Sequence, residues 1–211
     1  MCLGGDFAPG TLLSAYRQGI FPWPVSPQLV PWCSPDPRAI LRLDRAPEFS
    51  RSLRRAMRTK PFRVTVDQAF SRVVECCGDR EEGTWITDDL AVGFAELHRL
   101  GWAHSVEVWN TESGELVGGI YGLAVGSMFA GESMFHRETD ASKVAFASLA
   151  DRLHAAGYRL LDAQQMTSHL ASLGCEPIGR ERFLDLLSLM VNEERTFPVQ
   201  PLQAPTGGLV G

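Results

Sequence analysis

The stretch Ala130–Leu173, AGESMFHRETDASKVAFASLADRLHAAGYRLLDAQQMTSHLASL, contains the pattern that decides the fold. Its Gly-Glu-Ser sequence at 131–133 predicts a turn, and apolar residues at helical spacing predict a helix over 141–156. An apolar run predicts a strand over 159–162, and a second helix is expected over 167–173. A helix followed directly by a strand favours an α+β domain with a mixed sheet.

Two acids in this stretch lie at the edges of elements whose other residues are mostly apolar or small. They are Glu132 and Asp162. An unpaired buried charge costs several kcal/mol, so each carboxylate is expected to have a partner. Phe129, Met134 and Leu161 are candidates for the wall of a pocket beneath these acids. A packed core with two satisfied carboxylates is the alternative.

The composition limits the classes of protein that fit. The chain has 211 residues, 45% of them hydrophobic, which suits one globular domain with at most a small appendage. A net charge of -5 gives no global basic field for nucleic acid. Five cysteines without a C-x-x-C pair, and histidines without metal-ligand spacing, favour reduced thiols and no metal. Apolar runs fall short of the ~20 residues of a membrane helix, so we expect a soluble cytoplasmic protein.

Outside this stretch, the pattern predicts further helices and strands. The expected helices are 9–18, 50–59, 67–77, 87–100 and 180–192, and the expected strands are 39–43, 62–66, 103–109, 116–125 and 127–129. Ser50, Asp67 and either Thr87 or Asp88 are the candidate N-caps of three of these helices. Prolines between Gly19 and Arg38 exclude a long helix or a central strand there and indicate an ordered loop region. We therefore expect a small N-terminal domain at 1–38, a main domain at 39–196 and a loose tail at 197–211.

This order of elements is that of acyltransferases of the GNAT type. Acetyl-CoA is disfavoured as the donor, because residues 135–140 are acidic and contain no glycine where a pyrophosphate loop would open the following helix.

A basic cluster stands out against the acidic background. Six of the twenty Lys and Arg residues fall within one short stretch, namely Arg51, Arg54, Arg55, Arg58, Lys60 and Arg63. The first four recur at spacings of three and four, which predicts one helix face and a track for phosphates. A solvated surface helix is an equally good interpretation.

Two tryptophans, Trp23 and Trp85, lie in predicted loops, and Tyr16 is close to the first in sequence. Loop aromatics are suited to stacking a single-stranded base. Apolar plugs beneath loops are the commoner use of such residues and remain the alternative.

Seven motifs, in order, resemble those of the leucyl/phenylalanyl-tRNA–protein transferases. They are YRQGIFPW at 16–23, WCSPDPR at 32–38, EGTWIT at 82–87, HSVEVW at 104–109, LVGGIYG at 116–122, GESMF at 131–135 and LDAQ at 161–164. The resemblance implies a GNAT-like catalytic domain with a small N-terminal domain. It also implies transfer of Leu or Phe, with Met also fitting, from aminoacyl-tRNA to proteins that begin with Arg or Lys, without a metal or cofactor. Such transfer marks proteins for degradation, and we expect a monomer with no membrane partner.

The resemblance also implies roles for individual residues. Asp162 and Gln164 match the acid and amide at the reaction centre, and Glu132 matches the acid that holds the acceptor's N-terminal group. Trp23 and Trp85 match a pair that sandwiches the terminal adenine, with Tyr16 at the same end. The basic residues of 51–63 match the region that meets the acceptor stem. The residues that match the pocket for the Leu or Phe side chain are Ile120, Phe129, Gly131, Ser133 and Leu161.

Three features are left open by the sequence. The chain begins almost at the motif Leu3-Gly4-Gly5-Asp6, which suggests a truncated small domain or a misassigned start. His136 and Thr167 stand where Ser and Asn are expected. Either the carbonyl of Gln164 or a ribose hydroxyl of the tRNA could carry the proton.

If Phe129 crowds the donor's Cβ, Ile and Val are expected to be rejected.

Three other classes of function are alternatives to this one. A transferase acting on lipid or cell-wall precursors would be expected to show a membrane-facing helix. An RNA-binding protein without catalysis would not need acids near the phosphates. A peptide-binding adaptor would not need the basic helix.

Overall fold

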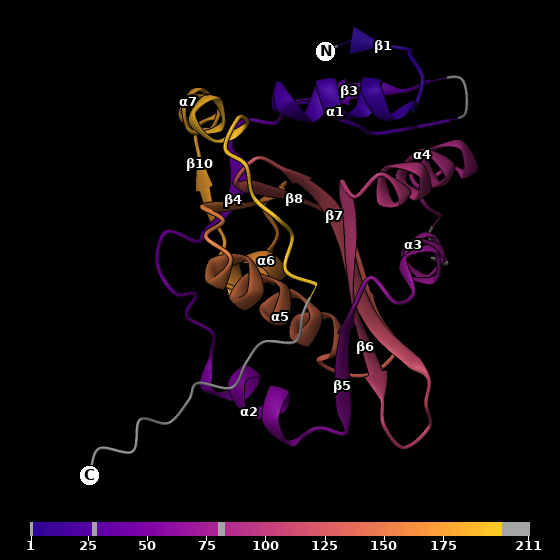
Figure 1. Ribbon diagram of the computed structural model, residues 1–211, viewed down its shortest axis with the longest axis vertical. Coiled ribbons are helices and arrows are strands. Elements are labelled where there is room, and N and C mark those ends of the chain that lie inside the picture. The colour runs from indigo at the N-terminus through magenta and orange to yellow at the C-terminus, as the bar shows by residue number, and fades with distance from the viewer. Residues whose placement is uncertain (1, 27–28, 80–82, 200–211) are drawn as a thin grey trace.

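The computed structural model describes residues 2–26, 29–79 and 83–199. A seven-stranded sheet with the order β10-β4-β9-β8-β7-β6-β5 forms its centre (Figure 1). Its strands are β4 (Arg38–Arg42), β5 (Phe62–Val66), β6 (Ala103–Asn110), β7 (Leu116–Val125), β8 (Met128–His136), β9 (Leu160–Gln164) and β10 (Glu176–Ile178). The helices are α1 (Pro9–Arg17), α2 (Arg51–Thr59), α3 (Phe70–Gly78), α4 (Asp88–Arg99), α5 (Ala141–Ala155), α6 (Ser168–Ser172) and α7 (Arg180–Met190).

The sheet combines an antiparallel meander with one parallel pair. Strands β5, β6, β7 and β8 pair antiparallel in chain order. Helix α5 then crosses over, and β9 returns parallel to β8. The predicted α+β fold with a mixed sheet is therefore confirmed. The parallel pairing runs from Met128↔Leu160 to Ala130↔Asp162, although β8 continues to His136.

Helices cover both faces of the sheet, as Figure 1 shows for α3 and α4 on one side and α5 and α6 on the other. Two apolar cores result. The first includes Tyr16 of α1, Phe94 of α4 and Tyr121 of β7, so the N-terminal segment packs directly on the main sheet. The second includes Phe146 of α5 and Leu161 of β9.

The proline-rich N-terminal segment is more regular than predicted. Strands β1 (Cys2–Leu3), β2 (Phe21–Pro22) and β3 (Pro31–Cys33) form a small antiparallel sheet with the order β1-β3-β2. These strands are two or three residues long, which agrees with the exclusion of a long helix or central strand.

The turn predicted at 131–133 is wrong, because β8 runs through it. The sequence Gly-Glu-Ser instead forms a β-bulge: Tyr121 pairs with Ser133 and the next residue, Gly122, pairs with Gly131. Glu132 is the extra residue. A bulge leaves its extra residue outside the ladder and turns its side chain in a new direction.

Helix caps were predicted in part. The hydroxyls of Ser50 and Thr87 accept hydrogen bonds from the first turns of α2 and α4, as expected. Asp67 does not cap α3, because its backbone has a left-handed φ of 56° and the helix begins at Phe70.

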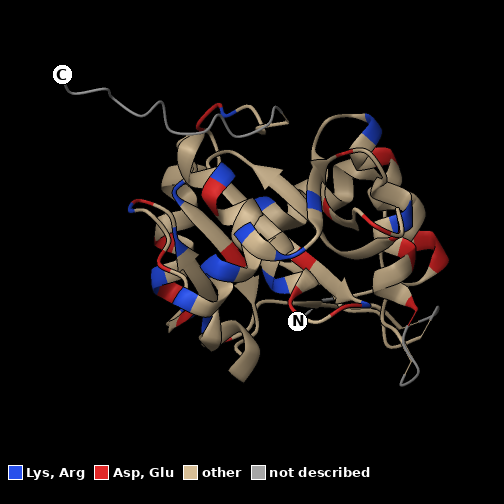
Figure 2. Cartoon of the chain, turned by 90° about the horizontal axis from the view of Figure 1, so that it is seen from below, with Lys and Arg blue, Asp and Glu red and all other residues tan. Residues whose placement is uncertain are grey.

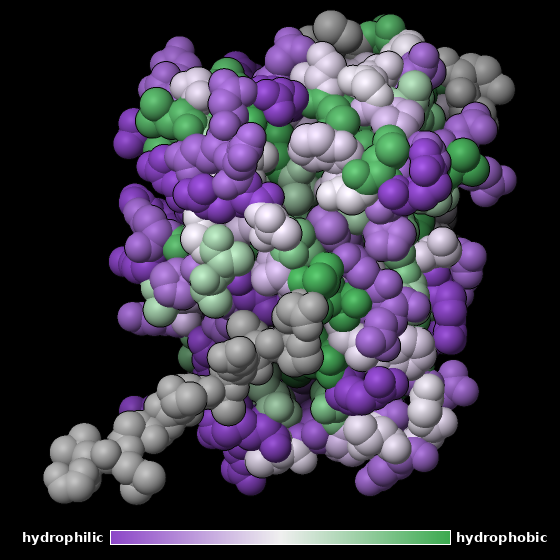
Figure 3. All heavy atoms as spheres, in the orientation of Figure 1, coloured by the Kyte–Doolittle hydropathy of each residue, from purple (hydrophilic) through white to green (hydrophobic). Residues whose placement is uncertain are grey.

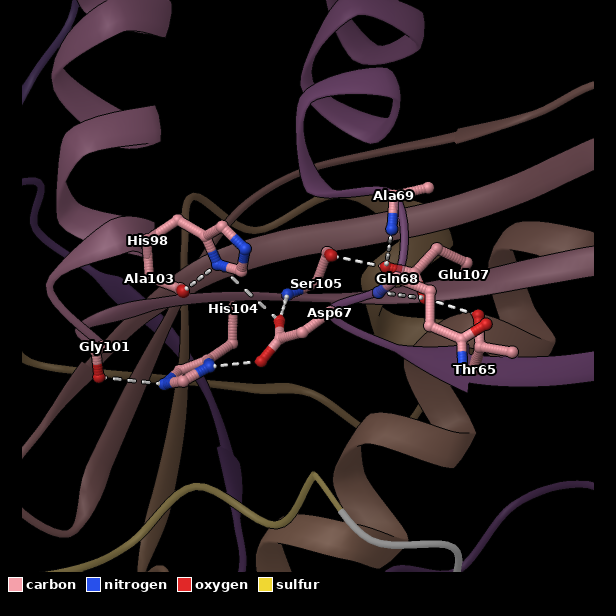
Figure 4. A network of polar contacts seen from close by, with 10 residues as sticks. All are labelled: Thr65, Asp67, Gln68, Ala69, His98, Gly101, Ala103, His104, Ser105 and Glu107. Atoms are coloured by element: carbon pink, nitrogen blue, oxygen red, sulfur yellow. Dashed lines mark hydrogen bonds and ion pairs between the residues drawn. The ribbon is translucent and has the colours of Figure 1, made fainter.

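A buried acid on β6 takes over that role. The carboxylate of Glu107 accepts from the hydroxyl of Thr65 at 2.5 Å and faces the amides of Gln68 and Ala69 at 3.5 Å (Figure 4). A negative charge at a helix N-terminus is favourable, so the network fixes the start of α3 on the sheet.

The C-terminal segment is ordered at Phe197, where a loose tail was predicted. Phe197 is buried and stacks on His104 with ring centroids 3.9 Å apart. Burial of an aromatic ring supplies the stabilisation that holds this segment. The rest of the predicted tail, 200–211, lies outside the described residues.

Charged and apolar side chains are interspersed on the surface. Figure 2 shows residues of both signs on many elements, and the face in Figure 3 mixes hydrophilic and hydrophobic residues. Among the described helices, none has the length and apolar character needed to cross a membrane.

Candidate active site

The site lies where β8 and β9 separate. The last paired residues are Ala130 and Asp162, and the bulged Glu132 and the end of β9 at Gln164 follow immediately. Two strands that stop pairing in the middle of a sheet leave space between them, and side chains from both strands meet there.

Asp162 is held by an arginine that the sequence analysis did not assign. Arg38 Nε and Nη2 donate to Asp162 Oδ1 and Oδ2 at 2.8 and 2.6 Å, and the two side chains are 1% and 0% exposed. The remaining Nη1 donates to Gly19 O at 3.0 Å. The rings of Phe21 and Phe183 lie 5.0 and 4.4 Å from the guanidinium carbon. The expectation that Asp162 has a partner is confirmed.

Gln164 is positioned by Asp162 through its backbone. Its N–H donates to Asp162 Oδ1 at 2.9 Å, and its φ of 63° is left-handed. This conformation costs a non-glycine residue roughly 1–3 kcal/mol and is held by surrounding contacts. The side chain then donates from Nε2 to Glu132 Oε1 at 2.9 Å. Asp162 thus orients Gln164, and Gln164 reaches Glu132.

Glu132 has the electrostatic character expected of a functional acid. Burial raises its pKa to about 8, the nearby Asp162 adds to this effect, and Tyr16, Arg38 and Gln164 oppose it. Glu132 Oε2 and the hydroxyl of Tyr16 are both buried, and the interaction of this hydroxyl with the carboxyl lowers the Glu132 pKa. A buried carboxyl whose pKa is raised by desolvation, beside a cavity, is a candidate for receiving a substrate group.

A small apolar cavity of about 80 Å³ adjoins Glu132. Four of the five predicted pocket residues line it, namely Ile120, Gly131, Ser133 and Leu161. Phe129, the fifth, is absent from the lining, and its ring lies 5.5 Å from that of Phe197. The sequence did not indicate the other wall, which α5 and α6 supply through Phe146 and Leu170.

The two loop tryptophans come together but leave no gap. Trp23 and Trp85 stack on each other with ring centroids 5.1 Å apart and planes inclined by 13°. A base between them would need two stacking distances of about 3.4 Å each. The predicted sandwich is therefore closed in this structure. Tyr16 is 1% exposed and packs beside Glu132 in the interior, not at the surface beside these tryptophans.

The basic residues of 51–63 differ in exposure and in whether they are paired with a carboxylate. Arg54 pairs with Asp151 of α5 and donates to Pro47 O, and Lys60 lies 3.3 Å from Asp140. These two cations are half-buried and are already paired with a carboxylate. The cations with exposed side chains are Arg51, Arg55, Arg58 and Arg63.

The structure shows where the two residues that depart from the expected motifs, Thr167 and His136, lie. Thr167 caps α6, with its hydroxyl accepting from Leu170 N at 3.1 Å, a role that Asn also performs. His136 ends β8 and is exposed. In the part of the chain that the structure describes, no group of three His, Cys, Asp or Glu side chains could hold a metal.

Sequence comparison places these features among known proteins. A family model described as leucyl/phenylalanyl-tRNA protein transferase matches residues 40–188, and the model of its N-terminal domain matches residues 5–36. A leucyl/phenylalanyl-tRNA–protein transferase of Shewanella baltica is 47% identical over 204 residues, covering 95% of this chain and 83% of that protein. One from Hahella chejuensis is 46% identical, covering 98% of this chain and 88% of its own length.

Similar solved structures are more distant. A GCN5-related N-acetyltransferase of Sphaerobacter thermophilus has a TM-score of 0.44 and 16% identity, covering 69% of this chain and 50% of its own. The C-terminal domain of a putative lysylphosphatidylglycerol synthetase of Agrobacterium fabrum has a TM-score of 0.47 and 12% identity, covering 90% of this chain and 72% of its own.

Proposed function

The chain belongs to the leucyl/phenylalanyl-tRNA–protein transferase family, and from this we propose that it transfers Leu or Phe from aminoacyl-tRNA to the α-amino group of proteins that begin with Arg or Lys. It is then an aminoacyltransferase of protein degradation that works in the cytoplasm as a monomer. The observation that carries the proposal is the Glu132–Gln164–Asp162–Arg38 chain of hydrogen bonds beside an apolar cavity.

The reaction needs positioning more than activation. Aminoacyl-tRNA is an activated ester, so no covalent enzyme intermediate is required. The acceptor nitrogen forms a bond to the ester carbon, the bond from that carbon to the ribose oxygen breaks, and a proton passes from the nitrogen to that oxygen. Holding amine and ester together can contribute ~7–11 kcal/mol to the rate.

Glu132 is suited to receive the acceptor amine. Its pKa of about 8 matches the roughly 7.7–8.0 of an α-amino group. A proton shared between groups of equal pKa moves with little change in free energy, which favours transfer. Binding as an ion pair and release of a neutral amine are then both accessible near neutral pH.

Gln164 is the second group aimed at the reacting atoms. Because its Nε2 donates to Glu132, its carbonyl oxygen is the atom left to accept from the attacking nitrogen. The ribose hydroxyl of the tRNA is the other candidate for the proton. In either case Asp162 acts by positioning, since both of its oxygens accept from Arg38.

The cavity is proposed to select the donor side chain. We expect Ile120→Ala to raise the Phe:Leu transfer ratio about tenfold, because an apolar pocket discriminates by ~1–3 kcal/mol per methylene. Competition between leucyl- and phenylalanyl-tRNA measures the ratio. Val117→Ala, also buried in the core beneath α5, is the control and should leave the ratio unchanged. Equal shifts in both variants would show that general loosening, and not the cavity, sets the preference.

Trp85 is proposed to contact the terminal adenine once its stack on Trp23 opens. Trp85→Ala should weaken leucyl-tRNA binding by about 5- to 150-fold, since a stacked base contributes ~1–3 kcal/mol. Filter binding measures the loss. Trp102, 37% exposed, provides the control: an equal loss in Trp102→Ala would argue against a specific stacking role.

The exposed cations of α2 are proposed to meet the acceptor stem. Arg55→Ala should reduce the slope of log K against log salt by about 1, as expected for one lost phosphate contact. Arg54→Ala is the matched control one residue earlier. Because Arg54 pairs with Asp151, its loss should lower stability and leave the salt slope unchanged. A salt slope that is unchanged in Arg55→Ala but reduced in Arg54→Ala would contradict the proposed contact of the exposed α2 cations with the tRNA.

The function itself is tested through the donor. The protein is incubated with leucyl-, phenylalanyl-, methionyl- or isoleucyl-tRNA and a peptide beginning with Arg, and the products are examined by mass spectrometry. We expect addition of one Leu, Phe or Met residue. Products from none of the four, with tRNA still bound, would instead support an RNA-binding protein.

A further inference from the structure

Strand β8 has an open edge that begins at the reaction centre. The pairing of β8 with β9 ends at Ala130↔Asp162, and beyond this point no strand of the described chain pairs with that side of β8. Met128 and Ala130 are buried, whereas Met134 is half-buried and His136 is exposed. The edge is therefore reachable as well as uncovered.

The backbone groups that face this edge follow from the pairing on the other side. Arg137 N–H donates to Val117 O of β7 at 2.7 Å. Because residues of an antiparallel strand alternate in the side to which their N–H and C=O point, Phe135 faces β7 like Arg137. Met134 and His136 then direct their N–H and C=O groups to the open side.

A groove accompanies the edge. A cavity of about 480 Å³ is lined by Met134 and His136 of β8, Asp79 beyond α3, and His169 of α6. Met134 also lines the small cavity beside Glu132, so the two hollows share a wall. The groove therefore adjoins the small cavity at Met134, and its lining includes the exposed His136 at the end of β8.

We propose that the first residues of the acceptor protein add to this edge as an extra parallel strand. The proposal rests on the proposed function. The α-amino group must reach Glu132 and Gln164, which lie where the open edge begins. A chain that starts there and runs towards His136 has the direction of β8, so the pairing is parallel.

The register of the added strand can be specified. In parallel pairing one residue is bonded to the two residues that flank its partner. The third acceptor residue donates its N–H to Met134 O and accepts from His136 N–H, and the first residue accepts from Met134 N–H. The N–H of the second residue points away from β8.

Strand addition suits an enzyme whose acceptors share little beyond their first residue. Main-chain hydrogen bonds give affinity without reading side chains. The groove walls carry both signs, with Asp79 and Arg137 among the lining residues, so no single charge is demanded of the following residues. Uncovered strand edges invite aggregation and are normally protected, which favours a functional reason for this one.

The test removes single backbone donors from the acceptor. A peptide with N-terminal Arg is compared with two analogues in which an ester replaces the amide before residue 2 or before residue 3. We expect the residue-3 ester to raise the acceptor KM about threefold to tenfold, the effect of one hydrogen bond. The residue-2 ester keeps every N–H that faces β8 and only weakens the carbonyl of residue 1 as an acceptor, so it should raise KM less than the residue-3 ester does. Equal KM values for the two esters, or the reverse order, would overturn the proposal.

A pair of enzyme variants tests the same contact from β8. His136→Pro removes a backbone N–H that faces the open side and should raise the acceptor KM by a similar factor, whereas His136→Ala should not. If His136→Pro unfolds, the ester series decides alone. Absence of transfer to the unmodified peptide would contradict the proposed function, and that result is distinct from equal transfer to all three peptides.

Discussion

Glu132→Gln is expected to lower kcat/KM for the acceptor by roughly 30- to 4,000-fold at pH 8. Loss of one partner of a buried, hydrogen-bonded charge pair costs ~2–5 kcal/mol, and 1.4 kcal/mol is a factor of ten. Gln keeps the shape of Glu132 and still accepts from Gln164 Nε2, so the fold and the cavity should be retained. Steady-state transfer at varied peptide concentration measures the effect, and binding of leucyl-tRNA should be unchanged.

The pH dependence of kcat/KM distinguishes a role of Glu132 in proton transfer from a role in packing alone. With a pKa of about 8 for Glu132 and roughly 7.7–8.0 for the amine, the state with one shared proton is most populated near pH 8. The wild-type kcat/KM should therefore fall on both sides of pH 8. In Glu132→Gln the alkaline fall should disappear. If kcat/KM of the variant still falls above pH 8, the ionisation responsible belongs to a group other than Glu132.

The same carboxyl should lower stability when it is ionised. Its pKa is 4.5 when unperturbed and about 8 in the fold. The folded state thus holds the proton more tightly, and stability falls as pH rises from 4.5 to 8. Glu132→Gln should nearly match the wild type at pH 4.5 and exceed it by about 3–5 kcal/mol at pH 9. Functional sites commonly contain residues that lower the stability of the fold but are needed for activity.

Arg38→Met is expected to destabilise the protein by about 3–5 kcal/mol, the cost of leaving a buried charge without its partner. Asp162 is 0% exposed and would keep one charge-free donor, the amide of Gln164. The substitution should also strongly reduce transfer, because Arg38 no longer holds Asp162 in the position from which it orients Gln164. Urea unfolding at pH 7 measures the free energy.

The control for Arg38 lies on the same strand. Arg42 pairs with Asp44, and their side chains are 53% and 44% exposed. Because exposed pairs contribute at most about 1 kcal/mol, Arg42→Met should change stability little. Arg38→Lys keeps the charge but not the two-point contact and should fall between the two. A cost below 1 kcal/mol for Arg38→Met would show that Asp162 finds another partner.

Local chemistry made part of this structure predictable. Ser50 and Thr87 precede their helices and do cap them, because a cap depends on a hydroxyl and a nearby amide. The apolar periodicity placed the meander, the α5 crossover and β9. The expectation that Asp162 is paired came from the cost of burying a charge.

The parts that the sequence did not reveal depend on contacts between distant segments. Arg38 and Asp162 are 124 residues apart in the sequence. The only indication of their pairing was that an arginine comes directly before the apolar residues of a predicted strand. The bulge at Glu132 is a property of strand register, so Gly-Glu-Ser looked like a turn. Arg54 pairs with Asp151 on a neighbouring helix, whereas Arg55 is exposed. The spacing of the arginines along α2 does not reveal this difference.

The acceptor rule tests the central claim most directly. Labelled Leu is supplied as leucyl-tRNA to one protein prepared with N-terminal Arg, N-terminal Ala or acetylated N-terminal Arg, with the wild-type enzyme and Glu132→Gln side by side. We expect the wild type to label the protein with a free N-terminal Arg alone and Glu132→Gln to label it far more slowly. Equal labelling of the Arg and Ala proteins, or equal rates for the two enzymes, would contradict the account.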